Sequence, residues 1–410
     1  MIREIVMKAV GVVVEYNPFH NGHLYHIQKA KELTQAEVVI AVMSGPFLQR
    51  GEPALISKWS RAEMALENGI DLIVELPYPF ATQHAAVFAS GAVEILQSLG
   101  CDYLCFGSES GNINEFDSIF NLLAEKKDEE DRLVKEYMKQ GMSYPKAKSC
   151  AIQELTSVNK TQGLNLHMPN NILGYEYYKS VRTNAYPMQV CTVARIKADY
   201  HDKKFTSDTI ASATSIREEL LQTAGSLTTI EPFLPSSSYQ ALQQYKETYL
   251  TYHTWENYWS YLKFRLLQTT AEELSTIYEI EEGIEYRFLK YVKEASSFQD
   301  FIRLLKTKRY TWTRLQRICV HILTNTKKEE MQTYSKPAYI RLLGTTANGR
   351  LYLKEKKKQF LLPIISKLSS FEKEKIVLDV RASQIYALGV PVAAQQKLLE
   401  MDYSKPPIMK

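Results

Sequence analysis

The sequence has few cysteines and no long apolar run, and both scarcities exclude classes of protein. Five cysteines are scattered over 410 residues. We interpret them as reduced core residues, with a metal-ligand role for Cys101 and Cys105 as the alternative. No apolar run reaches the roughly 18 to 20 residues that span a bilayer, and the N-terminus lacks the apolar segment of a signal peptide. We therefore expect a cytoplasmic protein without a membrane partner.

Acidic and basic residues are unevenly distributed, although the whole chain carries a net charge of only +4. Residues 1–225 contain 22 Lys and Arg against 27 Asp and Glu, a net charge of −5. Residues 226–410 contain 28 against 19, a net charge of +9. This asymmetry predicts that an anionic macromolecule binds mainly to the second part of the chain.

Short apolar runs alternate with helical patterns in the first part of the chain. The runs occupy residues 10–15, 37–43, 71–76, 101–106 and 188–196. Such continuous runs are typical of strands buried on both faces of a parallel sheet. They predict an α/β fold, a doubly wound parallel sheet with helical crossovers, over residues 1–225. After residue 225 helical periodicity dominates, so we expect a mainly α-helical domain over residues 226–410.

The motif His20-Asn21-Gly22-His23 stands between the first expected strand and a helix. Pro18 ends the strand, because it cannot donate a ladder hydrogen bond. A helix N-terminus offers N–H groups and partial positive charge to phosphates. The two imidazoles can donate hydrogen bonds to phosphate oxygens, and Gly22 would let a nucleotide approach the backbone. We interpret the motif as a nucleotide site; a cap or a core contact is the alternative.

A second polar helix start occurs late in the first part. Ser212 and Thr214 precede Arg217, and Ser215 with Glu218 fits a capping box. This arrangement can clamp a phosphate or serve only as a cap.

Three further residues lie where parallel strands or helices are expected to end or begin. Gly107 follows the fourth strand and would let an adenine or ribose lie against the backbone, and Arg195 lies near the end of the fifth strand. Asn171 follows Asn170 before a helix, where such residues either cap the helix or bind a ligand.

Residues 301–328 contain no acidic residue, and Tyr310 and Trp312 are interleaved with their basic side chains. This combination favours binding to an RNA backbone, with an ordinary solvated helix face as the alternative. The candidate contacts are Arg303, Lys306, Lys308, Arg309, Arg314 and Arg317.

The motif at residues 20–23 and the later SATSIR segment resemble the nucleotidyltransferase superfamily that includes the class I aminoacyl-tRNA synthetases. The chain is more specifically similar to the bacterial tRNA(Met) cytidine acetate ligases through VVVEYNPFHNGHLYH, MSGPFLQRGEPA, KWSRAEMAL, DLIVELP, FGSE, PNNILGYEY and SATSIR. The similarity continues through KRYTWTRLQR and YIRLLGTTANGR, so it covers nearly the whole chain.

The resemblance implies that acetate and ATP form acetyl-adenylate and diphosphate. The acetyl group then passes to N4 of the wobble cytidine in the anticodon of elongator tRNA(Met), which gives N4-acetylcytidine and AMP; acetyl-coenzyme A is not the donor. His20 and His23 would be catalytic, and Mg²⁺ would be held mainly by the phosphates rather than by protein side chains. With Ser212 and Thr214 added, the expected ATP contacts are Val13, Val14, Glu15, Tyr16, Asn17, Pro18, Phe19, His20, Asn21, Gly22, His23, Leu24, Tyr25, His26, Gly107, Asn171, Arg195 and Ile196.

Two other functions remain open at this point. One is a small-molecule adenylyltransferase, which would use the same motif to join AMP to a phosphorylated metabolite. The basic second part of the chain argues against it, because such enzymes rarely need one. The other is a non-catalytic RNA-binding protein, against which the intact motif and the SATSIR helix start argue.

Overall fold

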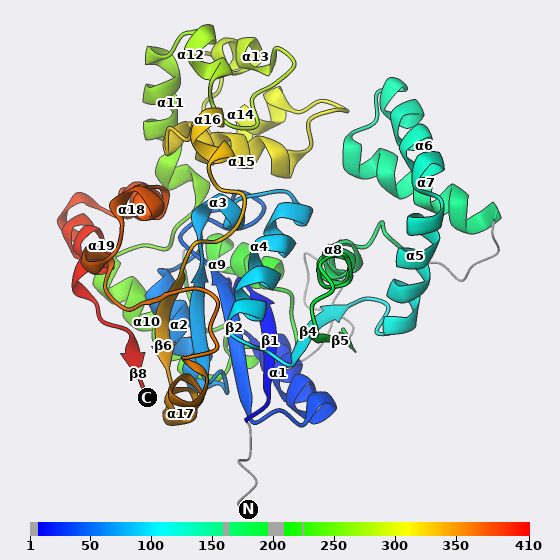
Figure 1. Ribbon diagram of the computed structural model, residues 1–410. Coiled ribbons are helices and arrows are strands. Elements are labelled where there is room, and N and C mark those ends of the chain that lie inside the picture. Colours follow the sequence, from blue (N-terminus) through cyan, green and yellow to red (C-terminus); the bar gives the residue numbers. More distant parts are fainter. Residues whose placement is uncertain (1–6, 159–163, 196–208, 224) are drawn as a thin grey trace, which may run out of the picture.

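The computed structural model describes residues 7–158, 164–195, 209–223 and 225–410 (Figure 1). Within these residues, eight strands form one sheet in the order β5-β4-β1-β2-β3-β6-β7, and β8 pairs with β6. The strands are β1 (Ala9–Val14), β2 (Val38–Ser44), β3 (Leu72–Leu76), β4 (Tyr103–Ser108), β5 (Gln189–Ala194), β6 (Ile340–Thr345), β7 (Ile364–Ile365) and β8 (Ile408–Met409).

The first five strands are parallel, and the chain winds outward from β1 in both directions. β1 pairs with β2, where Ala9 lies opposite Val38, and with β4, where Val10 lies opposite Tyr103. In open sheets of this kind, ligands bind outside the carboxyl ends of the strands where the winding reverses. The expected doubly wound sheet is confirmed, and its reversal point lies between β1 and β4.

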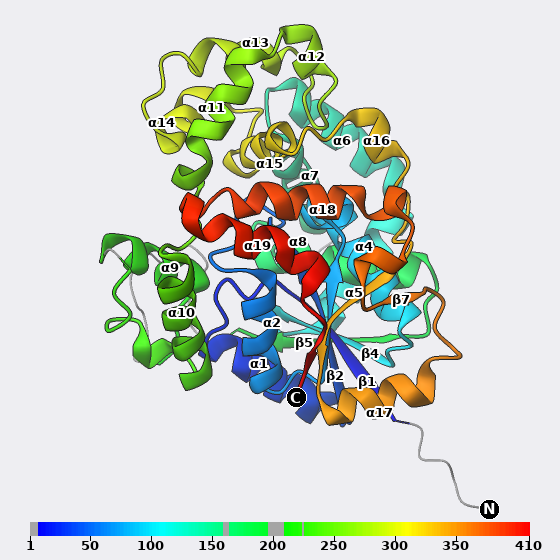
Figure 2. The same cartoon turned by 90° about the vertical axis from the view of Figure 1, so that its left-hand side faces the viewer.

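Both faces of the sheet are covered, which explains the continuous apolar runs (Figure 2). Alternate residues of each strand enter opposite cores: Val10 and Val12 enter one, and Ala9 enters the other. The first core contains α1 (Asn21–Thr34), α2 (Lys58–Glu67), α9 (Ala213–Gln222), α10 (Ser236–Tyr249) and α19 (Val392–Ser404). The second contains α3 (Tyr78–Ala81), α4 (Ala85–Ser98), α5 (Ile113–Glu125), α6 (Lys127–Lys139), α7 (Tyr144–Val158), α8 (Pro169–Thr183) and α17 (Ala347–Lys356).

A helical module with its own core lies beyond the carboxyl ends of the strands (Figure 1). Trp255 and Trp259 are both buried in this core, beside Phe298 and Phe301. The module consists of α11 (Trp259–Gln268), α12 (Ala271–Ser275), α13 (Ile284–Tyr291), α14 (Phe298–Leu305), α15 (Trp312–Leu323) and α16 (Lys328–Gln332), and α18 (Lys373–Ala387) packs beside it. Short 3₁₀ turns occur at Glu231–Phe233, Trp255–Tyr258 and Leu368–Ser370.

The helical module rests on the loop of residues 45–54, which follows β2. Phe47 and Leu48 belong to the core of the module. The indole N–H of Trp255 donates to the carbonyl of Gly51 at 2.9 Å. Gly51 has a φ of +76°, and a Cβ there would lie 2.3 Å from the backbone nitrogen of Arg317. The loop that borders the carboxyl edge of the sheet therefore also seats the helices of the second part.

The expected division at residue 225 needs a correction, because the second part of the chain also contributes strands to the sheet. β6 pairs antiparallel with β3, and β7 and β8 pair with β6. All six residues of β6 are buried. β6 thereby covers β3, which would otherwise be an edge strand with unpaired N–H and C=O groups. The second part is mainly helical as expected, but after residue 332 it also adds β6, β7 and β8 to the sheet beside α17, α18 and α19.

Four buried charges connect this added strand to the first part of the chain. Nζ of Lys58 lies 2.8 Å from Glu75 and 2.9 Å from Asp402. Arg341 on β6 contacts the same two carboxylates, at 3.4 Å and 3.3 Å. Each of the four side chains is at most 6% exposed. Two cations and two anions thus compensate each other where α2, β3, β6 and α19 meet.

We expect Asp402→Asn to destabilise the protein strongly, because it leaves Lys58 and Arg341 with a single carboxylate. Removing one partner of a buried ion pair costs about 3–5 kcal/mol. Urea denaturation measures the change in free energy of unfolding. Glu32→Gln is the control, because Glu32 pairs with Lys29 in the solvent, where such pairs contribute about 0–1 kcal/mol. Equal losses in the two variants would contradict a special role for the buried cluster.

Candidate active site

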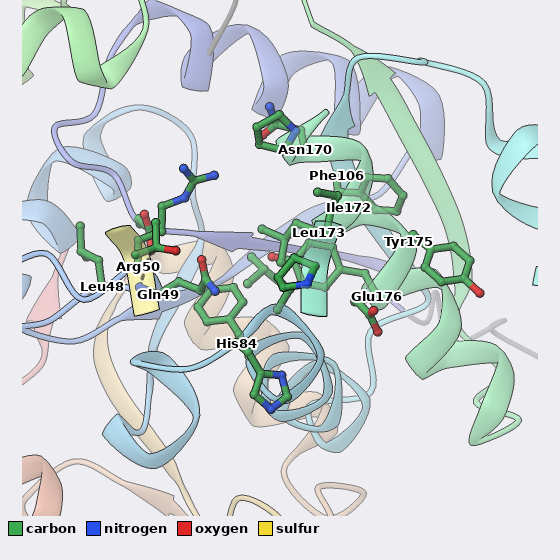
Figure 3. Close-up of a pocket in the computed structure, with 18 of the residues that line it drawn as sticks. Leu48, Gln49, Arg50, His84, Phe106, Asn170, Ile172, Leu173, Tyr175 and Glu176 are labelled. Carbon is green, nitrogen blue, oxygen red and sulfur yellow. Dashed lines mark hydrogen bonds between the residues drawn. The ribbon is translucent and has the colours of Figure 1, made fainter. Parts of the chain in front are cut away.

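A cavity of about 1120 Å³ lies at the carboxyl edge of the sheet. The ends of β1, β4 and β5 form its floor, and α7, α8, α9 and the helical module contribute to its walls. Figure 3 shows Gln49 and Arg50 on one side of the cavity, and Tyr175 and Glu176 of α8 on the other. The cavity therefore lies at the reversal point of the sheet and reaches the second part of the chain.

His20 and His23 cap the N-terminus of α1 reciprocally. Nδ1 of His20 accepts a hydrogen bond from the N–H of Gly22 at 3.0 Å. Nδ1 of His23 accepts one from the N–H of His20 at 3.3 Å. Because a neutral imidazole has one acceptor and one donor nitrogen, these contacts assign the proton of each ring to Nε2. The centroids of the two rings lie 3.8 Å apart. The two Nε2–H donors are therefore close enough to bind the same ligand.

Both rings are held in the neutral state. Burial, followed by the charges of Arg195 and Arg217, lowers the pKa of His20 to about 3. Burial, followed by the charges of His20 and Arg195, also lowers the pKa of His23. His26 lies on the same helix and lines the cavity, and burial lowers its pKa to about 4. Neutral imidazoles can donate from Nε2 to phosphate oxygens while they keep their cap bonds.

Gly22 serves a different purpose from the one expected. A Cβ at this position would lie 2.8 Å from Cε1 of His20. The absent side chain thus makes room for the imidazole that caps the helix. Gly107 fits its expected role better, because a Cβ there would meet nothing closer than Cγ of Arg195 at 3.8 Å. The backbone of Gly107 can be approached from the cavity that it lines.

Two arginines make the end of the cavity near the start of α1 positive. Arg195 follows β5, and its charge acts on all three histidines of α1. Arg217 of α9 donates to the carbonyl of Asn17 at 2.9 Å and to the carboxylate of Glu52 at 3.0 Å. With the partial positive charge of the α1 N-terminus, these cations favour an anion such as a phosphate.

The capping box expected at Ser215 and Glu218 is wrong, because Ser215 lies within α9 rather than at its N-cap. Ser212 is the N-cap of α9, and its hydroxyl accepts from the N–H of Ser215 at 3.0 Å. Ser212 and Thr214 nevertheless both line the cavity, so their hydroxyls lie near the expected phosphate site.

Most of the expected ATP contacts meet at the cavity, and five of those within the described residues do not. Those that line it are Val13, Val14, Glu15, Tyr16, Asn17, His20, Gly22, His23, Tyr25, His26, Gly107, Arg195, Ser212 and Thr214. Phe19 is fully buried in the core, and Leu24 packs against the same core. The Asn21 side chain donates to the carbonyls of Thr209 and Pro232 instead. Pro18 does not line the cavity either, and Ile196 lies outside the described residues.

Asn171 shapes the wall of the cavity without lining it. Its Oδ1 accepts from the N–H of Glu109 at 3.0 Å and of Ser110 at 3.1 Å. Its side chain is 2% exposed, so it orders the loop after β4 rather than contacting a ligand. The neighbouring Asn170 lines the cavity and donates to Glu109 at 2.7 Å.

The basic stretch is less available for RNA than its composition predicts. Arg303, Arg309, Arg314 and Arg317 form ion pairs with Asp300, Glu282, Glu281 and Glu279. Arg317 is also only 7% exposed, and Tyr310 is buried with its hydroxyl bonded to the carbonyl of Glu281. Three of these acids come from residues 279–282 and the fourth is Asp300; all lie outside the acid-free window but adjacent in space. Arg309, Arg314 and Arg317 line the cavity, whereas Lys306 and Lys308 are exposed outside it and have no ion pair within the described part of the chain.

The sequence interpretation did not identify the wall formed by α7 and α8. Phe106, Ile172, Leu173 and Tyr175 supply an apolar surface, and Lys148 pairs with Glu176 at 3.1 Å (Figure 3). The available signal was the helical spacing that brings Ile172, Leu173 and Glu176 to one face. His84, which begins α4, lines the same cavity and is exposed.

The structure adds three general observations. The five cysteines are free thiols, and Cys101, Cys105 and Cys319 are buried. No group of three or more His, Cys, Asp or Glu in the described ranges is placed to hold a metal ion. None of the helices described here combines the length and apolar composition needed to cross a membrane.

Comparisons with known proteins agree with this geometry. The family model of the HIGH Nucleotidyl Transferase matches residues 7–402. A tRNA(Met) cytidine acetate ligase of Geobacillus sp. (strain WCH70) is 47% identical over 98% of this chain and 100% of its own length. The protein of the same name from Bacillus subtilis (strain 168) is 49% identical over 98% and 97%. The crystal structure of Thermotoga maritima TmcAL bound with alpha-thio ATP is 34% identical, with a TM-score of 0.89 over 98% of this chain and 99% of that one.

The lowered pKa of His20 predicts a change in stability with pH. Its contribution is fully present above the ordinary histidine pKa of about 6.5, and is lost as the pH falls toward the folded value of about 3. We expect His20→Asn, which keeps a good N-cap, to make the loss of unfolding free energy between pH 6 and 4 less steep by about 1 kcal/mol per pH unit. Urea denaturation at several pH values measures the slope. An unchanged slope would show that His20 titrates normally.

Proposed function

Since this chain belongs to the HIGH nucleotidyl transferase family, we propose that it is an ATP-dependent tRNA(Met) cytidine acetate ligase. It activates acetate as acetyl-adenylate and then acetylates N4 of a cytidine in elongator tRNA(Met). The observation that carries the proposal is the pair of neutral, reciprocally capped histidines beside Arg195 and Arg217, at the reversal point of the sheet. The cavity that contains them extends to the basic second part of the chain.

In the first step, a carboxylate oxygen of acetate attacks the α-phosphorus of ATP, and the bond to the β-phosphate oxygen breaks. Negative charge on the phosphate oxygens must be stabilised as diphosphate leaves, and no covalent nucleophile of the protein is needed. The Nε2–H groups of His20 and His23 would donate to these oxygens, and Arg195 and Arg217 would balance their charge. Fixed donors of this kind need no reorganisation during the reaction.

ATP would lie across β1 and β4, with its triphosphate at the start of α1. The crystal structure of the Thermotoga relative holds alpha-thio ATP, which supports nucleotide binding in this fold. The backbone of Gly107 leaves room for the nucleoside. Mg²⁺ would be coordinated mainly by the phosphates and would neutralise part of their charge.

The second substrate is tRNA, and the helical module would contact it. The anticodon loop would enter the cavity between the module and α8, so that the wobble cytidine leaves its stack and presents its amino group. Lys306 and Lys308 would contact the phosphate backbone outside the cavity. A small-molecule adenylyltransferase is less well supported, since the helical module would then have no role.

We expect His23→Ala to abolish adenylate formation while tRNA affinity stays within about twofold. Loss of one fixed donor to a developing negative charge typically lowers the rate about 10²–10³-fold. Acetate-dependent exchange of labelled diphosphate into ATP measures the first step without tRNA. His167→Ala is the matched control, because His167 does not line the cavity. Parallel losses of exchange and tRNA binding would contradict the proposed separation of the two sites.

We expect the double variant Lys306→Ala, Lys308→Ala to weaken tRNA binding and to reduce its salt dependence. Two lost phosphate contacts lower the slope of log affinity against log salt by about 1.5. Filter binding over a range of salt concentrations measures this slope. The control is Lys357→Ala, Lys358→Ala, which removes the same charge at the end of α17, at the opposite end of the sheet from the helical module (Figure 1). Equal effects of the two double variants would place the tRNA elsewhere.

A further inference from the structure

Five carboxylates line the cavity within the described residues, and four of them are already neutralised by a cation. Glu52 pairs with Arg217 at 3.0 Å, and Glu176 pairs with Lys148 at 3.1 Å. Glu279 and Glu281 pair with Arg317 and Arg314, at 2.9 Å and 3.3 Å. The fifth carboxylate is Glu15, which has no such ion pair among the described residues.

Glu15 is held firmly although it has no cation partner. It follows the last residue of β1, and its backbone carbonyl accepts from Nη1 of the buried Arg61 at 2.7 Å. Its Oε1 accepts from the backbone N–H of Gln49 at 2.8 Å. In the described part of the chain, Oε2 has no hydrogen-bond partner. One oxygen of Glu15 is therefore fixed, and the other is available to a ligand in the cavity.

The surroundings of Glu15 increase the basicity of its carboxylate. Burial is the largest influence and raises the pKa of its carboxyl group, and Glu52 acts in the same direction. The backbone N–H of Gln49 and the charges of Arg50 and Arg217 oppose this rise. The other titratable groups that interact with Glu15 are Arg61 on α2 and Tyr177 on α8. A carboxylate with a raised pKa accepts a proton more readily than an ion-paired one.

The proposed acetyl transfer requires such a group. N4 of cytosine forms a bond to the carbonyl carbon of acetyl-adenylate, and the bond from that carbon to the phosphate oxygen of AMP breaks. One proton must leave N4, since the product is a neutral amide. Carboxylates also accept hydrogen bonds from the amino group of cytosine, whereas uracil has a carbonyl oxygen at this position and cannot donate.

We propose that Glu15 is the general base of the transfer step, with Oε2 accepting the proton that leaves N4 of the target cytosine. This inference rests on the proposed function. The proposed role has two consequences. Glu15 accelerates the transfer step, and it favours a nucleobase that carries an exocyclic amine. Adenylate formation does not use Glu15 as a base, because no proton is removed from acetate in the first step.

The test is Glu15→Gln in the full chain, which keeps an oxygen for the N–H of Gln49. Glu15 is also one of the expected ATP contacts that line the cavity, so acetate-dependent exchange of diphosphate into ATP, measured at saturating ATP, reports any loss in the first step. Single-turnover transfer of labelled acetyl to tRNA(Met) should fall about 10²-fold or more beyond that loss, the usual contribution of a general base. Equal losses in both steps, or an unchanged transfer rate, would overturn the proposal.

The pH profile of single-turnover transfer separates a base from a structural residue. In the wild type the rate should rise with pH to a plateau as Glu15 loses its proton, and in Glu15→Gln the remaining rate should not follow this rise. Glu15→Asp provides a second variant, which keeps the carboxylate and should retain the pH-dependent rise at a lower rate. The same rise in Glu15→Gln would overturn the assignment. A wild-type protein without acetate-dependent exchange would instead refute the proposed function itself.

Discussion

The reciprocal cap between His20 and His23 is the constraint on which the account of this site depends. Each ring uses Nδ1 to complete the start of α1 and thereby keeps its proton on Nε2. Burial beside Arg195 prevents a second proton from binding, so the rings remain neutral donors rather than cations. The helix start that stabilises the fold and the group that would bind phosphate are thus the same four residues.

The second part of the chain is joined to this site by packing rather than by a flexible linker. The loop after β2 contributes Phe47 and Leu48 to the core of the helical module, and it also holds Glu15 through the N–H of Gln49. The buried cluster around Lys58 and Asp402 attaches the last helix and β6 to the same sheet. Because these contacts share elements with the cavity, the position of the helical module is tied to the position of the nucleotide site.

The strands of the first part and the motif at residues 20–23 could be predicted from the sequence, because strands buried on both faces must be continuously apolar. β6 could not be predicted from the sequence. A run of six residues between helices has no periodicity that distinguishes a strand from a buried helix segment. The ion-pair partners of Arg314 and Arg317 could not be predicted either. These acidic residues lie in the segment 279–282, and counting charges along the chain does not detect contacts between distant segments. Asn171 illustrates the same limit, because a ligand contact and a loop contact use the same amide group.

The central claim is that acetate, activated by ATP, is transferred to a cytidine of tRNA(Met). The most direct measurement is mass spectrometry of nucleosides from elongator tRNA(Met) after incubation with the protein, ATP, Mg²⁺ and isotope-labelled acetate. The account predicts labelled N4-acetylcytidine at the wobble position, formed only when ATP is present. Unlabelled tRNA together with continued release of diphosphate from ATP would contradict it, and would indicate a small-molecule acceptor instead.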